Sequence, residues 1–130
     1  MARSFPACVS AVVLRESGLI GLEAADPSDL AIPTVVLHEL EYGTLKISSA
    51  ARRKVLSEML DRIEAIPFDK LAARESARVR LQLERAGAAI GPMDLLIAGT
   101  ALSRGAVLVT NNTREFERIR NLRLEDWSEI

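Results

Sequence analysis

Residues 88–116, AAIGPMDLLIAGTALSRGAVLVTNNTREF, contain a helix start, a buried helix, a buried strand and a polar strand end in one continuous unit. Gly91 and Pro92 end any helix or strand that precedes them, and proline suits the first position of a helix. We therefore expect a helix from Met93 to about Ser103. Most of its circumference is apolar, which is typical of a helix in the core rather than on the surface.

Polar residues lie at the start of this helix and after the strand that follows it. Asp94 lies in the first helical turn, where the helix dipole favours an ionised carboxylate that can hold a cation. The apolar run at 106–109 is rich in β-branched residues and indicates a parallel strand covered on both faces. It runs directly into Thr110, Asn111 and Asn112. Ligands bind beyond the carboxyl ends of the strands in open α/β sheets, so we expect these residues at the rim of a site.

The size and composition of the chain indicate one domain, residues 1–130, with a sizeable core. The balance of 17 basic and 18 acidic residues argues against general nucleic-acid binding, although a local basic patch is compatible with it. Cys8 is the only cysteine, so no internal disulfide can form. No apolar run is long enough to span a bilayer, and we expect a cytoplasmic protein without a membrane partner.

The rest of the chain alternates between expected strands and helices, which predicts an α/β layer fold with a mostly parallel sheet. We expect the amphipathic helices within 48–66 and at 70–86 to pair with each other. The other expected elements are a helix at 7–14, a strand at 30–32, a helix from about residue 34 with Thr34 as N-cap, a short strand within 65–69, a loop beginning at 115–117 and an edge strand at 122–124.

Four polar residues, Glu39, Asp94, Asn112 and Glu115, lie at the ends of expected elements. Mg2+ takes oxygen ligands, usually one or two carboxylates with waters and substrate phosphates, so acids that converge at a strand end suit phosphodiester hydrolysis. From spacing alone, a surface salt bridge is an open alternative for each acid. Asn112 with Thr110 can hold a water or a phosphate oxygen, or simply close a turn.

Other charged residues also allow two interpretations. Glu39 lies among the apolar residues of its expected helix, where a carboxylate needs a metal or an arginine as partner. The adjacent His38 is expected to be hydrogen-bonded structure rather than a base. Four arginines on the outer face of the helix at 70–86 can contact RNA phosphates or form a solvated face balanced by Glu75 and Glu84; they are Arg74, Arg78, Arg80 and Arg85.

Three motifs in series resemble the PIN-domain ribonucleases of the VapC toxin family. They are LAIPTVVLHELEYG at 30–43, GPMDLLIA at 91–98 and LVTNNTREF at 108–116. The resemblance implies a three-layer α/β/α domain that is the toxin half of a toxin–antitoxin pair. It also implies RNA cleavage that depends on Mg2+ or Mn2+, often with tRNA as substrate, and a cognate VapB-like antitoxin as partner.

The resemblance also implies roles for individual residues. Glu39 and Asp94 match two metal-binding acids of the family, and Asn112 matches a catalytic strand-end position that holds an acid in some members and asparagine in others. We expect substrate-positioning roles for the residues around this strand end, namely Thr110, Asn111, Arg114 and Glu115.

The front of the chain departs from the family pattern. Family members begin with a short apolar strand that ends in Asp-Thr-Asn, and its Asp is the first metal ligand. Here the residues at 7–9 fit the continuation of that motif, which puts Ser4 at the Asp position. No register supplies the acid, and loss of one ligand should weaken metal binding.

Three hypotheses follow from these residues. The first is an endoribonuclease, impaired or not by the missing acid, and the second is a catalytically degenerate PIN domain that binds an antitoxin or RNA. An unrelated nucleotide-binding domain is disfavoured because the chain has no Gly-rich phosphate loop. We also expect a homodimer, since exposed apolar helix faces tend to be covered.

Overall fold

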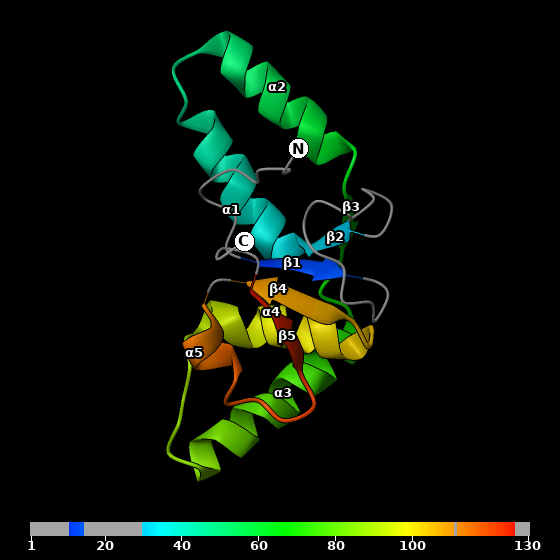
Figure 1. The fold of residues 1–130 in the computed structure, drawn as a ribbon, viewed down its shortest axis with the longest axis vertical. Helices are drawn as coiled ribbons and strands as arrows, with labels where there is room; N and C mark the ends of the chain where they lie inside the picture. Colours follow the sequence, from blue (N-terminus) through cyan, green and yellow to red (C-terminus); the bar gives the residue numbers. More distant parts are fainter. Residues whose placement is uncertain (1–10, 15–29, 111, 127–130) are drawn as a thin grey trace.

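A five-stranded sheet forms the centre of the fold (Figure 1). The computed structural model describes residues 11–14, 30–110 and 112–126. The described elements are β1 (Ala11–Leu14), β2 (Leu30–Pro33), α1 (Thr34–Leu45), α2 (Ala50–Asp61), β3 (Glu64–Ile66), α3 (Lys70–Arg85), α4 (Pro92–Ser103), β4 (Val107–Thr110), α5 (Thr113–Phe116) and β5 (Arg123–Glu125).

The strand order in the sheet is β3-β2-β1-β4-β5. β2 pairs parallel with β3, and β4 pairs parallel with β5. β1 lies between them and is antiparallel to both neighbours, with Val13 opposite Ala31 on one side and Leu108 on the other. All the strands except β1 therefore run in one direction, which confirms the mostly parallel α/β sheet.

The predicted helix at 7–14 is wrong for residues 11–14, which form the strand β1. The rest of that expected helix lies outside the described residues. The reason for the strand is long-range, since β2 and β4 would each leave a row of backbone N–H and C=O groups unpaired without a strand between them. The β-branched Val12 and Val13 suit such a position.

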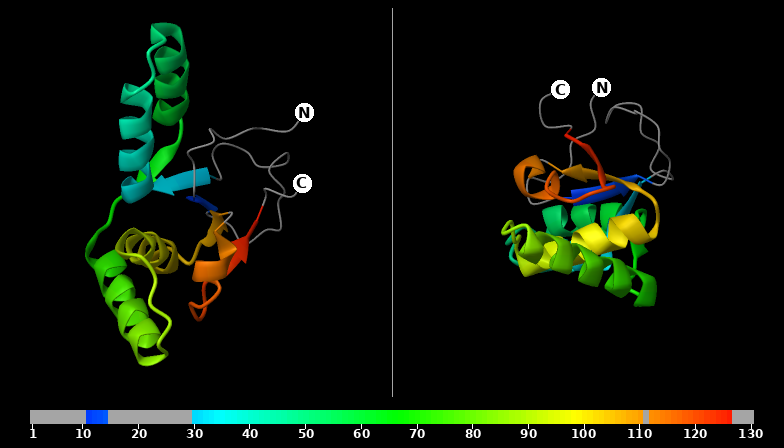
Figure 2. Two further views of the ribbon diagram at one scale, coloured as in Figure 1. Left: turned by 90° about the vertical axis from the view of Figure 1, so that its left-hand side faces the viewer. Right: turned by 90° about the horizontal axis from the view of Figure 1, so that it is seen from below.

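α4 lies between α3 and the sheet (Figure 2). Its bounds agree with the predicted core helix, and the stretch Ile97–Ala101 is buried. α3 approaches so closely that a Cβ atom built on Gly99 would come within 2.6 Å of the Ser76 Cβ and 2.7 Å of the Ala72 carbonyl oxygen. The Ser76 hydroxyl donates a hydrogen bond to the Leu95 carbonyl across this contact, at 3.0 Å.

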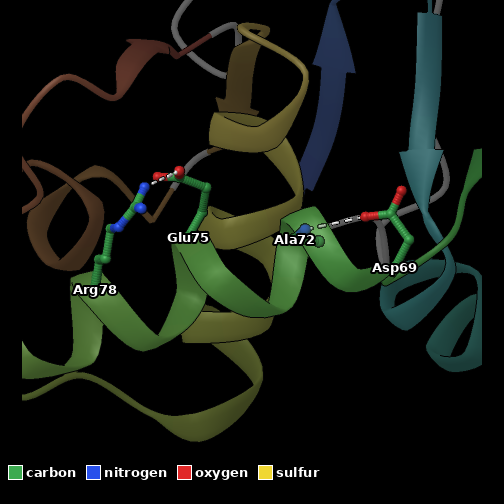
Figure 3. Close-up of polar contacts among 4 residues, drawn as sticks. All are labelled: Asp69, Ala72, Glu75 and Arg78. Atoms are coloured by element: carbon green, nitrogen blue, oxygen red, sulfur yellow. Dashed lines mark hydrogen bonds and ion pairs between the residues drawn. The ribbon is translucent and has the colours of Figure 1, made fainter.

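α3 begins and ends as the sequence predicts. The Asp69 carboxylate caps its first turn by accepting a hydrogen bond from the Ala72 backbone N–H at 3.0 Å (Figure 3). Such a cap contributes about 1 kcal/mol to the free energy of unfolding. At the other end the chain turns at Gly87, whose φ of 65° lies in the left-handed region that favours glycine.

α1 and α2 form a helical hairpin, here called the arm, which stands away from the sheet (Figures 1 and 2). α1 buries a stripe of Val36, Leu40 and Thr44. Thr34 is the first helical residue and not the N-cap; Pro33 holds that position in an extended conformation, without a side-chain cap. The reason is that β2 leads directly into α1 and leaves no linker residue for a cap.

The predicted pairing of the two amphipathic helices is wrong. α2 packs along α1, whereas α3 packs along α4, and α2 and α3 lie at opposite ends of the molecule (Figure 1). β3 separates the two helices, and the small residues on α3 fit the equally small face of α4. As a result Val55 of α2 and Leu71 of α3 are 64% and 57% exposed, although the helical pattern places both on the inner face.

The end of the described chain returns to the sheet. α5 replaces the loop expected from residues 115–117, because the buried Phe116 and Ile119 fold this segment back onto the core. The predicted edge strand is confirmed as β5. Within the described ranges, no helix is both long and apolar enough to cross a membrane.

Two glycines in helices give a matched test of the α3–α4 contact. We expect Gly99→Ala to lower the free energy of unfolding by about 1–3 kcal/mol, because the added methyl group meets backbone and Cβ atoms that cannot move independently. Gly43→Ala should raise it by up to about 1 kcal/mol, since the site has no atom within 4 Å and alanine favours the helix. Urea denaturation measures both changes, and a stabilised Gly99→Ala variant would contradict this packing.

Candidate functional site

The candidate site lies where the parallel strands end. α1 begins directly after β2, and α5 begins shortly after β4 (Figure 1). Thr110, the last residue of β4, is buried, and its hydroxyl oxygen accepts a hydrogen bond from the Asn112 backbone N–H at 3.0 Å. This bond turns the chain at the strand end, as one of the two interpretations of Thr110 and Asn112 predicts.

Asp94 is held by the start of α4. Gly91 is the N-cap, Pro92 is the first helical residue, and Asp94 is the acidic residue of the first turn. The carboxylate is half-buried, and a Cβ atom built on Gly91 would lie 3.7 Å from one of its oxygens. Glycine therefore leaves the carboxylate open on that side.

The structure brings Asp94 together with Glu115 of α5. Burial, a side-chain hydrogen bond with Glu115 and the negative charge of Glu115 together raise the pKa of Asp94 to about 6, and burial is the largest of the three causes. Two carboxylates in hydrogen-bond contact cannot both ionise without cost, so the pair favours either a shared proton or a bound cation. This pairing of two dispersed acids is the main chemical feature of the site.

Glu39 occupies a different environment from the one expected. Its position among apolar residues predicts a buried carboxylate in need of a partner, but both Glu39 and His38 are exposed on α1. The buried stripe of α1 leaves them on the solvent side. Among the residues that the structure describes, no three His, Cys, Asp or Glu side chains form a group that could hold a metal ion. Metal binding by Glu39 thus stays a prediction.

The remaining predicted residues surround the Asp94–Glu115 pair along the chain. Asn112 is half-buried at the N-cap position of α5 and makes no side-chain capping bond, so its amide is not used by the helix. Arg114 is exposed, one residue before Glu115. Asn111 and Ser4 lie outside the described residues.

β1 brings no acid to this edge within its described residues. Because the strand is antiparallel, its first residue, Ala11, pairs with Thr110, and its last residue, Leu14, pairs with Val107 at the other end of β4. The described residues of β1 are Ala, Val, Val and Leu. The position that holds the first metal ligand in the family pattern is therefore not matched by an acid in β1.

Two of the four arginines of α3 form the ion pairs that the charge-balanced interpretation predicts. Arg78 forms an ion pair with Glu75 at 2.7 Å (Figure 3), and Arg80 forms one with Glu84 at 3.1 Å. Both pairs are largely exposed and stabilise the helix by less than about 1 kcal/mol each. For these two residues the solvated, charge-balanced face is confirmed; Arg74 and Arg85 are exposed as predicted.

The sequence left the role of Glu115 weakly defined. Its position three residues after Asn112 and one residue before the buried Phe116 marks a segment that must fold back toward the strand end. The pairing with Asp94 depends on how α5 packs, and no local sequence pattern predicts that the two side chains lie close together. The oxygen-only character of the pair fits a hard divalent cation such as Mg2+ or Mn2+.

The raised pKa of Asp94 predicts a pH-dependent stability. Between its ordinary pKa of 3.8 and about 6, the folded chain binds more protons at this group than the unfolded chain, so this contribution to stability falls as the pH rises through that range. We expect Asp94→Asn to match the parent near pH 4 and to be more stable at pH 7.5 by about 1 kcal/mol, after allowance for solvent screening. Urea titrations across this pH range test the difference.

The exposed carboxylate of Asp61 provides the control for that experiment. An Asp61→Asn variant should keep the pH profile of the parent, because this side chain lies at the end of α2 and away from Glu115. Parallel profiles for the parent and Asp94→Asn would contradict the assignment of the carboxylate pair.

Comparison with known proteins now identifies the family. The PIN-domain model matches residues 7–122. A tRNA(fMet)-specific endonuclease VapC from Shigella flexneri is 45% identical over 100 residues, which make up 76% of this chain and 76% of the relative.

Solved structures agree with this match. A crystal structure of DNA-bound VapBC from Salmonella typhimurium has a TM-score of 0.68 at 44% identity, over 75% of this chain and 74% of that one. A structure of VapBC2 from Rickettsia felis, bound to a DNA fragment from its promoter, has a TM-score of 0.68 at 41% identity, with the same coverage. The resemblance carried by the three motifs is thereby confirmed, and the chain belongs to the PIN-domain family as a VapC-like member.

Proposed function

We propose that this chain is the toxin half of a toxin–antitoxin pair and acts as a divalent-metal-dependent endoribonuclease, with tRNA as the favoured class of substrate. The observation that carries the proposal is the Asp94–Glu115 carboxylate pair at the strand-end edge. The names of the VapC relatives, one of which is a tRNA(fMet)-specific endonuclease, support the substrate class.

We assign the metal site to Asp94 and Glu115, and Glu39 stays a predicted ligand that the described structure does not group with these two acids. A cation would relieve the repulsion between the carboxylates of Asp94 and Glu115. Glu39 lies on α1, which begins at the end of β2, and β1 separates β2 from β4 in the sheet. A bound Mg2+ or Mn2+ would activate a water and offset the charge that develops on the phosphate. The ionised carboxylates also offer an acceptor for the proton that the attacking water gives up.

We assign substrate positioning to the residues that follow β4. The side-chain amide of Asn112, free of a capping role, can donate hydrogen bonds to a phosphate oxygen, and Thr110 fixes the backbone that presents it. The exposed guanidinium of Arg114 can pair with a neighbouring phosphate. Asn111 completes this proposed group.

The proposal predicts that cleavage depends on Glu115 and not on the next acid in the chain. We expect Asp94→Asn and Glu115→Gln each to slow Mn2+-dependent cleavage of RNA by about 100-fold, because each removes a charged ligand. Glu117→Gln is the matched control, since Glu117 is exposed and two residues farther on. Cleavage of a labelled tRNA by the purified variants measures the effect. Equal rates for Glu115→Gln and the parent would refute the site.

We further propose a VapB-like antitoxin as partner, a homodimer as the assembly, residues 1–130 as a single domain and the cytoplasm as the compartment. The partner is supported by the relatives whose structures are VapBC complexes. The exposed apolar side chains of the amphipathic helices, which include Val55 and Leu71, offer surface for protein contacts.

A second function is favoured by one observation, the antiparallel β1 without an acid. In that case the chain is a catalytically degenerate PIN domain that binds an antitoxin or RNA. An inert parent chain, with cleavage gained by Ser4→Asp alone, would support this second function. Cleavage by the parent that is lost in Asp94→Asn would refute it, because the site would then work without the missing acid.

A further inference from the structure

The solvent side of α1 carries a line of three exposed side chains that leads away from the candidate site. Glu39, Tyr42 and Lys46 are spaced three and four residues apart, so they lie on one face of the helix. All three are exposed, and Tyr42 is 53% exposed. The rise from Glu39 to Lys46 is roughly 10 Å along the helix axis, a distance that a few nucleotides can cover.

Tyr42 and Lys46 already contact each other. The Lys46 ammonium lies 4.2 Å from the centroid of the Tyr42 ring. An exposed cation–π contact of this kind stabilises the protein by about 0.5–1 kcal/mol at most, which does not explain an aromatic ring of this size on the solvent side. The pair does offer the two groups that single-stranded RNA binds, a π-face for a base and a cation for a phosphate.

The arm continues this line into a basic tip. Residues 46–57 contain four basic residues and no acid, although the whole chain has a net charge of −1; the four are Lys46, Arg52, Arg53 and Lys54. Arg53 donates a hydrogen bond to the Ser48 carbonyl at 3.1 Å and another to the Ile47 carbonyl, so the turn between α1 and α2 is held in place. The local charge complements a polyanion rather than an apolar protein segment.

We propose that Tyr42 is a stacking platform for a base of the substrate RNA and that Lys46 contacts an adjacent phosphate, so that the RNA runs from the acidic site along α1 to the basic tip of the arm. The inference rests on the proposed ribonuclease function. The competing occupant of this surface is a protein partner that would use the exposed apolar side chain of Leu45, which is 77% exposed.

The test compares two ligands, a labelled hexamer of riboadenylates and a ribose-phosphate strand of the same length that carries no bases. Binding is measured by fluorescence anisotropy with EDTA present, so that hydrolysis does not interfere. Tyr42→Ala should weaken binding of the riboadenylate hexamer roughly 5- to 100-fold and leave binding of the base-free strand unchanged, because stacking needs a base. Tyr42→Phe keeps the ring and should bind both strands like the parent.

Lys46→Ala should weaken binding of both strands and reduce the slope of log affinity against log salt by about 0.7, as expected for one lost phosphate contact on a single strand. Leu45→Ala is the control and should bind both strands like the parent. A loss of RNA binding in Leu45→Ala that equals the loss in Tyr42→Ala would overturn the stacking role and favour an apolar contact.

The outcomes separate this inference from the proposed function. If the parent cleaves RNA and Asp94→Asn does not, but Tyr42→Ala binds the hexamer as tightly as the parent, the platform is refuted and the ribonuclease stands. If neither the parent nor any variant binds or cleaves RNA, both proposals fail together.

Discussion

The close approach of α3 to α4 is the constraint on which the rest of the structure depends. α4 touches α3, α1 and the strands β2 and β4, so its depth in the fold sets the position of most of the core. Gly99 allows that depth, and the Ser76 hydroxyl donates a partly buried hydrogen bond to the Leu95 carbonyl. Because Asp94 directly precedes Leu95 in α4, the same packing that closes the core also fixes the carboxylate at the edge of the sheet.

The carboxylate pair of the candidate site is unfavourable for stability, whereas the α3–α4 packing stabilises the fold. Asp94 is held in a half-buried position beside Glu115, where burial and a like charge both disfavour its ionised form. A protein selected for stability alone would place a neutral side chain there. Sites that bind a substrate or an ion commonly retain such unfavourable pairs, because the ligand supplies the missing interaction. The carboxylate pair is therefore better explained by binding than by folding.

The sequence predicts the parts of this fold that depend on local patterns. It does not predict the parts that depend on contacts between distant segments. The bounds of α4 and β4 follow from Gly91-Pro92 and an apolar β-branched run, and the amphipathic pattern at 70–86 agrees with the bounds of α3. The partners of α2 and α3 could not be predicted, because both have amphipathic patterns that fit several neighbours. The strand β1 and the proximity of Asp94 to Glu115 likewise depend on contacts between distant residues.

Because β1 is antiparallel to its neighbours, an acid at the site edge would have to occupy a different position in the sequence of this strand. In a parallel strand, the residue that reaches the ligand edge follows the apolar run, as Thr110 follows the apolar residues of β4. In β1 the edge is reached by the residue that begins the run, since Ala11 pairs with Thr110. A motif of apolar residues followed by aspartate would put the carboxylate at the opposite edge. With this strand direction, a functional acid must precede the apolar residues.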